Sequence, residues 1–255
     1  MDEIHELNSG TRGANLEFLM VRMFSLVPFV QLVGLSATIN NPEFLTSWLN
    51  QLTPEGRDFN LIKSHTRPVK LEYRLQVAEN KERALREHVD RVINDGGQVL
   101  IFVNRRKDCT KLCDALKATV KRSLNYQEQH DADTMHDVLR QKRSLARDLV
   151  HCVPYGIAYH NASLGKTERD LVEHYYLKKS IKVVVATTTL AAGVNTPART
   201  VVVYDIVQWS KHYNVKGEDF DQQGAMMAIG GHGVMKPHSP NMMFQMLGRA
   251  GRRGF

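Results

Sequence analysis

Short apolar segments that alternate with helical segments constrain the fold of this chain more than any other feature. The segment 97–103 is apolar and is predicted to be a buried strand, with helices predicted before and after it over 79–94 and 106–120. Strands joined through helices run parallel, so we expect an α/β fold with a parallel sheet flanked by helices. The same alternation predicts strands over 157–159, 182–186 and 200–204 and a helix over 166–178.

The first 66 residues form a separate unit in this prediction. Residues 29–35 are predicted to be a buried strand, and the stretch 42–52 is predicted to be a helix with a proline near its start. A domain boundary is expected near residue 66, because a new strand is predicted over 69–77. Residues 1–66 are too few for a complete doubly wound domain, so we expect some of their apolar faces to be exposed.

The composition favours a polyanionic partner and argues against a membrane protein. The 255 residues are 42% apolar, which is enough for a packed interior, and they carry a net charge of +7. No apolar run approaches the roughly 20 residues that span a bilayer. Cys109, Cys113 and Cys152 form no disulfide framework and lack metal-ligand spacing, so we expect them in the core of an intracellular protein, cytoplasmic or nuclear.

Four motifs follow one another along the chain. Asp2-Glu3-Ile4-His5 comes first, and Ser36-Ala37-Thr38 follows the first predicted strand. The string from Ala186 to Asn195 reads ATTTLAAGVN, and the string from Gln245 to Arg252 reads QMLGRAGR. The phosphate-binding loop pattern G-x-x-x-x-G-K-[ST] occurs nowhere in the 255 residues.

In this order the motifs resemble those of superfamily 2 DExH-box helicases, in the branch of the fork-repair DNA helicases and RNA-exosome helicases. The resemblance covers essentially the whole chain and implies tandem RecA-like parallel sheets, with an incomplete first domain in 1–66 and a second domain in 67–255. It also implies ATP and Mg²⁺ as cofactors and 3′–5′ translocation on a single-stranded or forked nucleic acid. The analogy of residues 12–17 and 190–198 favours DNA over RNA.

The resemblance implies that residues of both domains surround ATP. Asp2 would bind Mg²⁺ on the nucleotide phosphates, and Glu3 would position the attacking water. Arg252 would be the arginine finger and Arg249 its partner on the γ-phosphate; such a finger raises the rate by ~10³–10⁵. Gln245, Gly193 and Asn195 would face the nucleotide. His5, Ser36 and Thr38 would couple the nucleotide site to strand separation.

A second set of residues would contact the nucleic-acid backbone. Asn104 and Arg106 stand between a predicted strand and a predicted helix, where an amide and a guanidinium can bind an anion. Asn104 also suits the N-cap position of that helix, and the two roles are compatible. His160 and Asn161 belong to a string that resembles HHAGL, from which Asn161 departs. The set is completed by two hydroxyl donors, Thr187 and Thr189.

Two segments lie outside these motifs. Residues 125–150 are polar, rich in His and Gln, and predicted to be a helical insertion of open function. Residues 205–244 combine aromatic, glycine and methionine residues. Related helicases have a strand-separating β-hairpin in the corresponding region, so we expect one here, with side chains that stack on the last base pair. The histidines of this segment match no standard zinc spacing.

For the isolated chain we expect no ATP turnover, because it lacks the phosphate-binding loop. A partner or a further segment of the protein would have to supply that loop. A rival interpretation is a non-catalytic nucleic-acid-binding remnant, or one subunit of a split helicase. The arginines of the last motif favour an active parent, because a pure binding module has no need of them.

Overall fold

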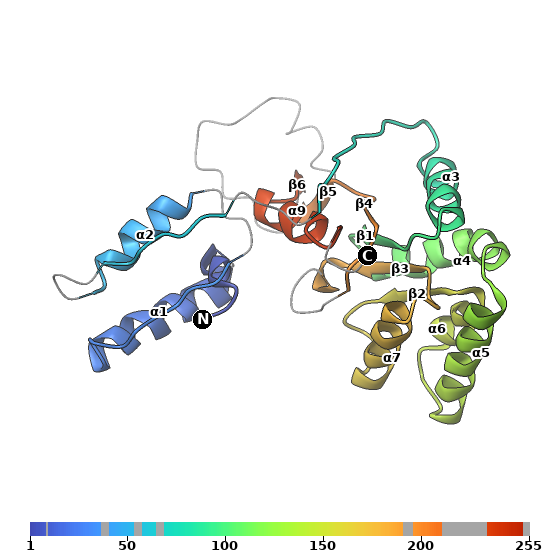
Figure 1. Cartoon of the computed structure of the whole chain (residues 1–255), viewed down its shortest axis with the longest axis horizontal. Coiled ribbons are helices and arrows are strands. Elements are labelled where there is room, and N and C mark those ends of the chain that lie inside the picture. The colour runs from blue at the N-terminus through green and yellow to red at the C-terminus, as the bar shows by residue number, and fades with distance from the viewer. Residues whose placement is uncertain are drawn as a thin grey trace. The chain divides into compact units, whose positions relative to one another are not determined.

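A computed structural model describes residues 1–8, 10–36, 41–53, 58–64, 69–190, 196–210 and 234–251. The chain divides into two compact units, Met1–Arg67 and Pro68–Phe255 (Figure 1). Each unit is described below by itself.

The second unit is built around a parallel sheet of four strands. These are β1 (Val99–Val103), β2 (Ile157–His160), β3 (Val183–Thr187) and β4 (Thr200–Val203), in the spatial order β2-β3-β1-β4. Val103 lies opposite Thr187 and His160 opposite Ala186, so the carboxyl ends of three strands meet at one edge. The predicted α/β fold with a parallel sheet is confirmed.

Helices flank this sheet and supply the rest of the core. They include α3 (Lys81–Asn94), α4 (Arg106–Arg122) and α7 (Lys166–Leu177), which agree with the predicted helices to within a few residues. Their apolar sides are buried, with Leu116 and Tyr176 fully enclosed. Before β1, the Gln98 amide donates to the carbonyl oxygens of Tyr176 at 2.7 Å and Ile181 at 2.8 Å. This buried amide joins the start of the sheet to the end of α7.

The region 125–150 is helical and packs on the sheet domain. It contains α5 (Tyr126–Gln141) and the start of α6 (Arg147–Cys152), which the short 3-10 helix η2 (Val153–Tyr155) follows. Figure 1 shows α5, α6 and α7 side by side. Although most of α5 is polar, its inner side buries Ala132, Met135 and Leu139.

A two-stranded antiparallel hairpin follows the sheet. Its strands are β5 (Val207–Ser210) and β6 (Val234–Pro237), with Val207 opposite Pro237. The residues between them, 211–233, lie outside the described part of the chain. After the hairpin comes α9 (Pro240–Leu247), in which the Ser239 hydroxyl caps the first turn by accepting from the backbone N–H of Met242 at 3.3 Å.

The first unit consists of η1 (Ile4–Asn8), α1 (Gly10–Leu26) and α2 (Pro42–Asn50). Its small core contains Ile4, Met20, Phe24 and Leu49. The close packing of α1 on η1 requires a glycine at position 13 of α1, because a Cβ on Gly13 would lie 2.1 Å from the carbonyl oxygen of Leu7. None of the described helices of either unit has the length and apolar character needed to cross a membrane.

Two predicted strands are wrong. Residues 29–35 and 69–77 form no strand and belong to no sheet, and Phe29, Val33 and Val77 are largely exposed. The segment around 33–35 only exchanges backbone hydrogen bonds with residues 1–4, including Ile4 N–H to Leu35 O at 3.0 Å. A segment becomes part of a sheet only beside a strand that can pair with it, and the described residues of the first unit contain no strand to pair with 29–35.

Candidate nucleic-acid interface and nucleotide-facing residues

In the first unit, the residues predicted to couple ATP to strand separation lie together. The His5 side chain is buried, and its Nδ1 lies 3.0 Å from the Ser36 hydroxyl and 3.3 Å from Glu3 Oε2. Thr38 lies outside the described residues. His5 therefore joins the acidic motif to the Ser36 motif across 31 positions of sequence.

The two carboxylates predicted at the nucleotide are adjacent and accessible. Asp2 is exposed and its Oδ1 accepts from the Glu3 N–H at 2.9 Å, while the Glu3 side chain is 45% exposed. Mg²⁺ in nucleotide sites typically takes one or two carboxylates together with substrate phosphates. Asp2 fits that donor chemistry, whereas the sequence has no loop to hold the phosphates. Among the described residues no group of three or more His, Cys, Asp or Glu side chains could hold a metal ion by itself.

In the second unit, the carboxyl edge of the sheet gathers most of the predicted nucleic-acid contacts. Asn104 follows β1, His160 ends β2 and Thr187 ends β3. Arg106 is exposed at the first position of α4, where the backbone N–H groups of the helix point outward. Thr189 belongs to a short 3-10 helix, η3 (Thr188–Leu190), and its side chain lies outside the described part.

His160 and Asn161 are directed into the protein. The His160 side chain is buried, and its Nε2 lies 3.2 Å from Glu173 Oε1 on α7. Asn161 is also buried; its Oδ1 accepts from the backbone N–H of Ser163 at 2.9 Å, and its side chain hydrogen-bonds Cys109. Both side chains therefore order the loop after β2, a role that the sequence pattern did not predict.

The environment of His160 predicts a pH-dependent stability. Burial lowers its pKa below the ordinary 6.5, although Glu173 acts in the opposite direction. The unfolded chain therefore binds more protons than the folded chain once the pH falls below about 6.5, and stability is lost there. The unfolding free energy falls as the pH drops from about 6.5 to 5. We expect His160→Gln to reduce the slope of this fall by at most about 1.4 kcal/mol per pH unit. Urea unfolding at several pH values, with exposed His130→Gln as control, measures this; equal slopes would contradict it.

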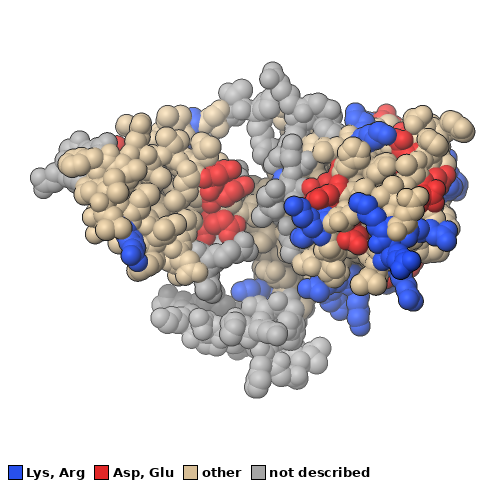
Figure 2. Space-filling model, turned by 90° about the horizontal axis from the view of Figure 1, so that it is seen from below, with Lys and Arg blue, Asp and Glu red and all other residues tan. Residues whose placement is uncertain are grey.

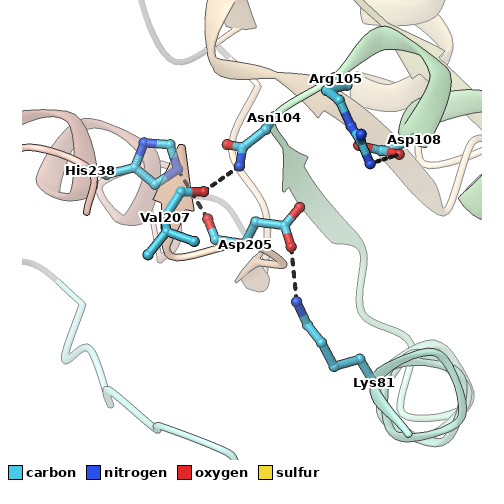
Figure 3. Close-up of polar contacts among 7 residues, drawn as sticks. All are labelled: Lys81, Asn104, Arg105, Asp108, Asp205, Val207 and His238. Atoms are coloured by element: carbon cyan, nitrogen blue, oxygen red, sulfur yellow. Dashed lines mark hydrogen bonds and ion pairs between the residues drawn. The ribbon is translucent and has the colours of Figure 1, made fainter. Parts of the chain in front are cut away.

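Asn104 holds the root of the hairpin, as Figure 3 shows. Its side-chain amide donates to the carbonyl oxygen of Val207, the first residue of β5. The N-cap position of α4 is occupied by Arg105, which makes no side-chain capping hydrogen bond and instead pairs with Asp108 at 2.9 Å. The alternative of Asn104 as N-cap is therefore wrong, because its side chain is used by the hairpin.

Two further side chains, Lys81 and His238, fix the same root (Figure 3). Lys81 Nζ lies 2.9 Å from Asp205 Oδ1 and 4.4 Å from the centroid of the Tyr204 ring. His238, which follows β6, has its Nε2 3.0 Å from the carbonyl oxygen of Asp205. A carbonyl oxygen only accepts, so Nε2 carries the proton. We call Lys81, Asn104, Asp205, Val207 and His238 the hairpin root.

The last motif lies at the other end of β4. Ala198, two residues before β4, donates its N–H to the carbonyl oxygen of Arg249 at 3.0 Å and accepts from the Gly251 N–H at 3.0 Å. The Arg249 side chain is buried, and Gln245 lies on α9. Gly193, Asn195 and Arg252 lie outside the described residues. The predicted site residues of the second unit thus form two groups, at opposite ends of the strands.

Comparison with known proteins agrees with this geometry. The family model of the helicase conserved C-terminal domain matches residues 80–254. The ATP-dependent DNA helicase Hel308 of Pyrococcus horikoshii is 38% identical over 220 residues, 83% of this chain. Hel308 of Thermoplasma acidophilum is 33% identical over an alignment of 264 residues that covers 100% of the chain.

The chain spans only 29% and 33% of the length of these two relatives. The family match, by contrast, includes every element from α3 to α9 together with the whole of the last motif. The predicted resemblance to superfamily 2 helicases is confirmed, and the chain belongs to the family of the helicase conserved C-terminal domain.

Proposed function

We propose that this chain is part of an ATP-dependent 3′–5′ helicase that couples ATP hydrolysis to the unwinding of duplex DNA. One observation carries the proposal: a hairpin is anchored by its root to the edge where three parallel strands end. On that edge lie Arg106 and Thr187, which suit the backbone of one strand, while Asn104 holds the hairpin beside them to meet the duplex. DNA is preferred over RNA because the two Hel308 relatives are DNA helicases by name. A DNA substrate implies an intracellular location.

The proposed nucleotide contacts come from both units. Asp2 would hold Mg²⁺, Glu3 would orient a water, and His5 with Ser36 would transmit the state of the site. Gly193, Asn195, Gln245, Arg249 and Arg252 would approach the nucleotide from the second unit. Bound Mg-ATP would supply the phosphoryl group whose hydrolysis drives the cycle. Because the phosphate-binding loop is missing from the 255 residues, we propose that the chain alone does not turn over ATP.

Binding and hydrolysis by the purified chain test this proposal. We expect fluorescence anisotropy to detect binding of single-stranded DNA that weakens as salt rises, with a logarithmic slope of about −0.7 for each phosphate contacted. A colorimetric phosphate assay should detect no ATP hydrolysis with or without that DNA. DNA-stimulated hydrolysis that disappears in Arg252→Ala would contradict the inactivity of the isolated chain, and the absence of DNA binding would contradict the helicase assignment.

A split helicase is the second candidate, and the exposed apolar surface of the first unit is compatible with it. Phe18, Phe29, Val33 and Ile62 are each at least 60% exposed. Apolar side chains in such number usually lie against other protein, here either the rest of a RecA-like domain or a partner that carries the phosphate loop. Co-purification of a second polypeptide with that loop, followed by DNA-stimulated ATPase activity of the pair, is the expected result for a split helicase. Activity in one longer polypeptide would exclude it.

A further inference from the structure

The connection between α5 and α6 is strongly basic. Residues 140–147, which we call the basic loop, contain Arg140, Lys142, Arg143 and Arg147 and no acidic residue. All four side chains are exposed, and among the described residues none of them forms an ion pair. Figure 2 shows lysine and arginine side chains gathered on a face of this unit. Four unneutralised cations in eight residues repel one another unless an anion lies between them.

One of these cations occupies a position where glycine would be more stable. Arg143 has a φ of 50°, in the left-handed region. Its N–H donates to the carbonyl oxygen of Arg140 at 3.0 Å, and the N–H of Ser144 donates to that of Leu139 at 3.0 Å. This pair of bonds is the Schellman motif that ends a helix, in which the left-handed residue is usually glycine. The chain therefore has an arginine where helix termination alone would select a residue without a Cβ.

The basic loop is joined to the carboxyl edge of the sheet through α7. The Ser144 hydroxyl donates to Glu168 Oε1 in the first turn of that helix at 3.0 Å. The next residue, Arg169, lies close enough to His160 for its positive charge to lower the pKa of that ring, as burial also does. His160 ends β2 at the proposed nucleic-acid edge. A strand that follows this edge past α7 therefore reaches the basic loop.

Helix electrostatics explain only part of the charge. The macrodipole of α5 favours cations in its last turn, which accounts for Arg140. It does not account for Lys166, which is exposed at the first position of α7, where the dipole disfavours a cation. The acidic residues nearest in sequence are Asp137, Asp148, Glu168 and Asp170, of which Glu168 is used by Ser144. An excess of positive charge therefore remains on the basic loop, whereas at the start of α7 Glu168 and Asp170 balance Lys166 and Arg169.

We propose that the basic loop, together with Lys166, binds the phosphodiester backbone of a nucleic-acid strand and extends the contact made by the carboxyl edge. The inference rests on the proposed function, because that edge is itself a proposed strand contact. The contact is independent of base sequence and consists of charge-assisted hydrogen bonds from guanidinium and ammonium groups to phosphate oxygens. It gives the helical insertion a role in holding the strand.

Removal of the four charges tests this inference. In the variant R140Q/K142Q/R143Q/R147Q, we expect the salt slope of single-stranded DNA binding by the whole chain to become shallower by about 3, because four phosphate contacts are lost. R83Q/R86Q is the control: these arginines pair with Glu87 and Glu82 on α3, and their removal tests the effect of net charge alone. The change in salt slope is divided by the number of charges removed in each variant. If this change per charge is equal in the two variants, the proposal is overturned.

A single glycine substitution separates binding from stability. In Arg143→Gly we expect a slope shallower by about 0.7, together with a midpoint of thermal unfolding raised by about 2–4 °C, because the left-handed strain is removed. Lys179→Gly is the matched control, since Lys179 ends α7 with a φ of 66° and the same pair of backbone bonds. It should raise the midpoint and leave DNA binding unchanged. Weaker binding in both variants, or in neither, would overturn the assignment of Arg143.

Two further outcomes distinguish this inference from the proposed function. If Thr187→Val weakens binding and the four-charge variant does not, the carboxyl edge contacts DNA and the basic loop does not. If the four-charge variant loses binding and Thr187→Val keeps it, the basic loop is a DNA contact and the proposed edge is not. Absence of DNA binding by the unaltered chain would overturn both.

Discussion

Replacement of Asn104 by alanine is expected to slow unwinding of forked DNA about tenfold, while binding of single-stranded DNA stays unchanged. The variant leaves the carbonyl oxygen of Val207 without its donor. A buried acceptor without a donor costs about 1–3 kcal/mol, and because this contact is partly buried we place its cost in the lower half of that range; a cost of 1.4 kcal/mol corresponds to a factor of ten in the population of the correctly oriented hairpin. Single-turnover strand displacement and DNA-stimulated ATP hydrolysis, measured in a form of the protein that hydrolyses ATP, test the expectation.

The neighbouring arginine provides a matched control. The Arg105 side chain pairs with Asp108 of α4 (Figure 3), and only the charge of Asp205 acts on it from the hairpin root, so Arg105→Gln should leave unwinding unchanged. His238→Ala should share the defect of Asn104→Ala, because it removes a second contact at the same root. If Asn104 instead contacts phosphate, its alanine variant would have a shallower salt slope and lose single-stranded binding. That result would contradict a positioning role.

The sheet could be predicted because its strands carry their signal locally. Residues 99–103 and 183–187 are nearly continuous apolar runs bounded by polar residues, as expected for strands buried on both faces. The segment 29–35 is also mostly apolar, and 69–77 alternates apolar and polar residues as a half-buried strand would, yet neither is a strand. Burial of a strand depends on neighbours elsewhere in the chain, which a local pattern does not report.

The candidate site was predicted less completely, since its contacts join distant residues. The sequence identified Asn104, but its partner Val207 lies 103 positions away and offers only a backbone carbonyl, which every residue has. Lys81 and Asp205 are 124 positions apart and belong to no motif. His238 belongs to the histidines of 205–244, which match no zinc spacing, and its contact with a backbone carbonyl has no signature in composition or spacing. The motif residues were found because the family resemblance identified them.

The second large effect is expected at Arg249. In a form of the protein that binds ATP, Arg249→Ala should lower DNA-stimulated hydrolysis by about 10³-fold, because a guanidinium that stabilises charge on the transferring phosphoryl group contributes ~10³–10⁵. Affinity for single-stranded DNA should persist, because Arg249 lies beside Ala198 at the start of β4. Asn104 and Thr187 lie at the opposite end of the sheet strands. Phosphate release measures the first quantity and fluorescence anisotropy the second.

A structural role for Arg249 gives a different pattern of results. Its side chain is buried, and its backbone already joins α9 to the segment before β4, so removal of the side chain also affects packing. Arg249→Lys keeps most of the volume and the charge but cannot form the planar, bidentate contact of a guanidinium. If Arg249 acts on the nucleotide, the lysine variant loses hydrolysis at an unchanged unfolding midpoint. If Arg249 only supports the fold, that variant hydrolyses ATP normally, whereas the alanine variant loses thermal stability and DNA binding together.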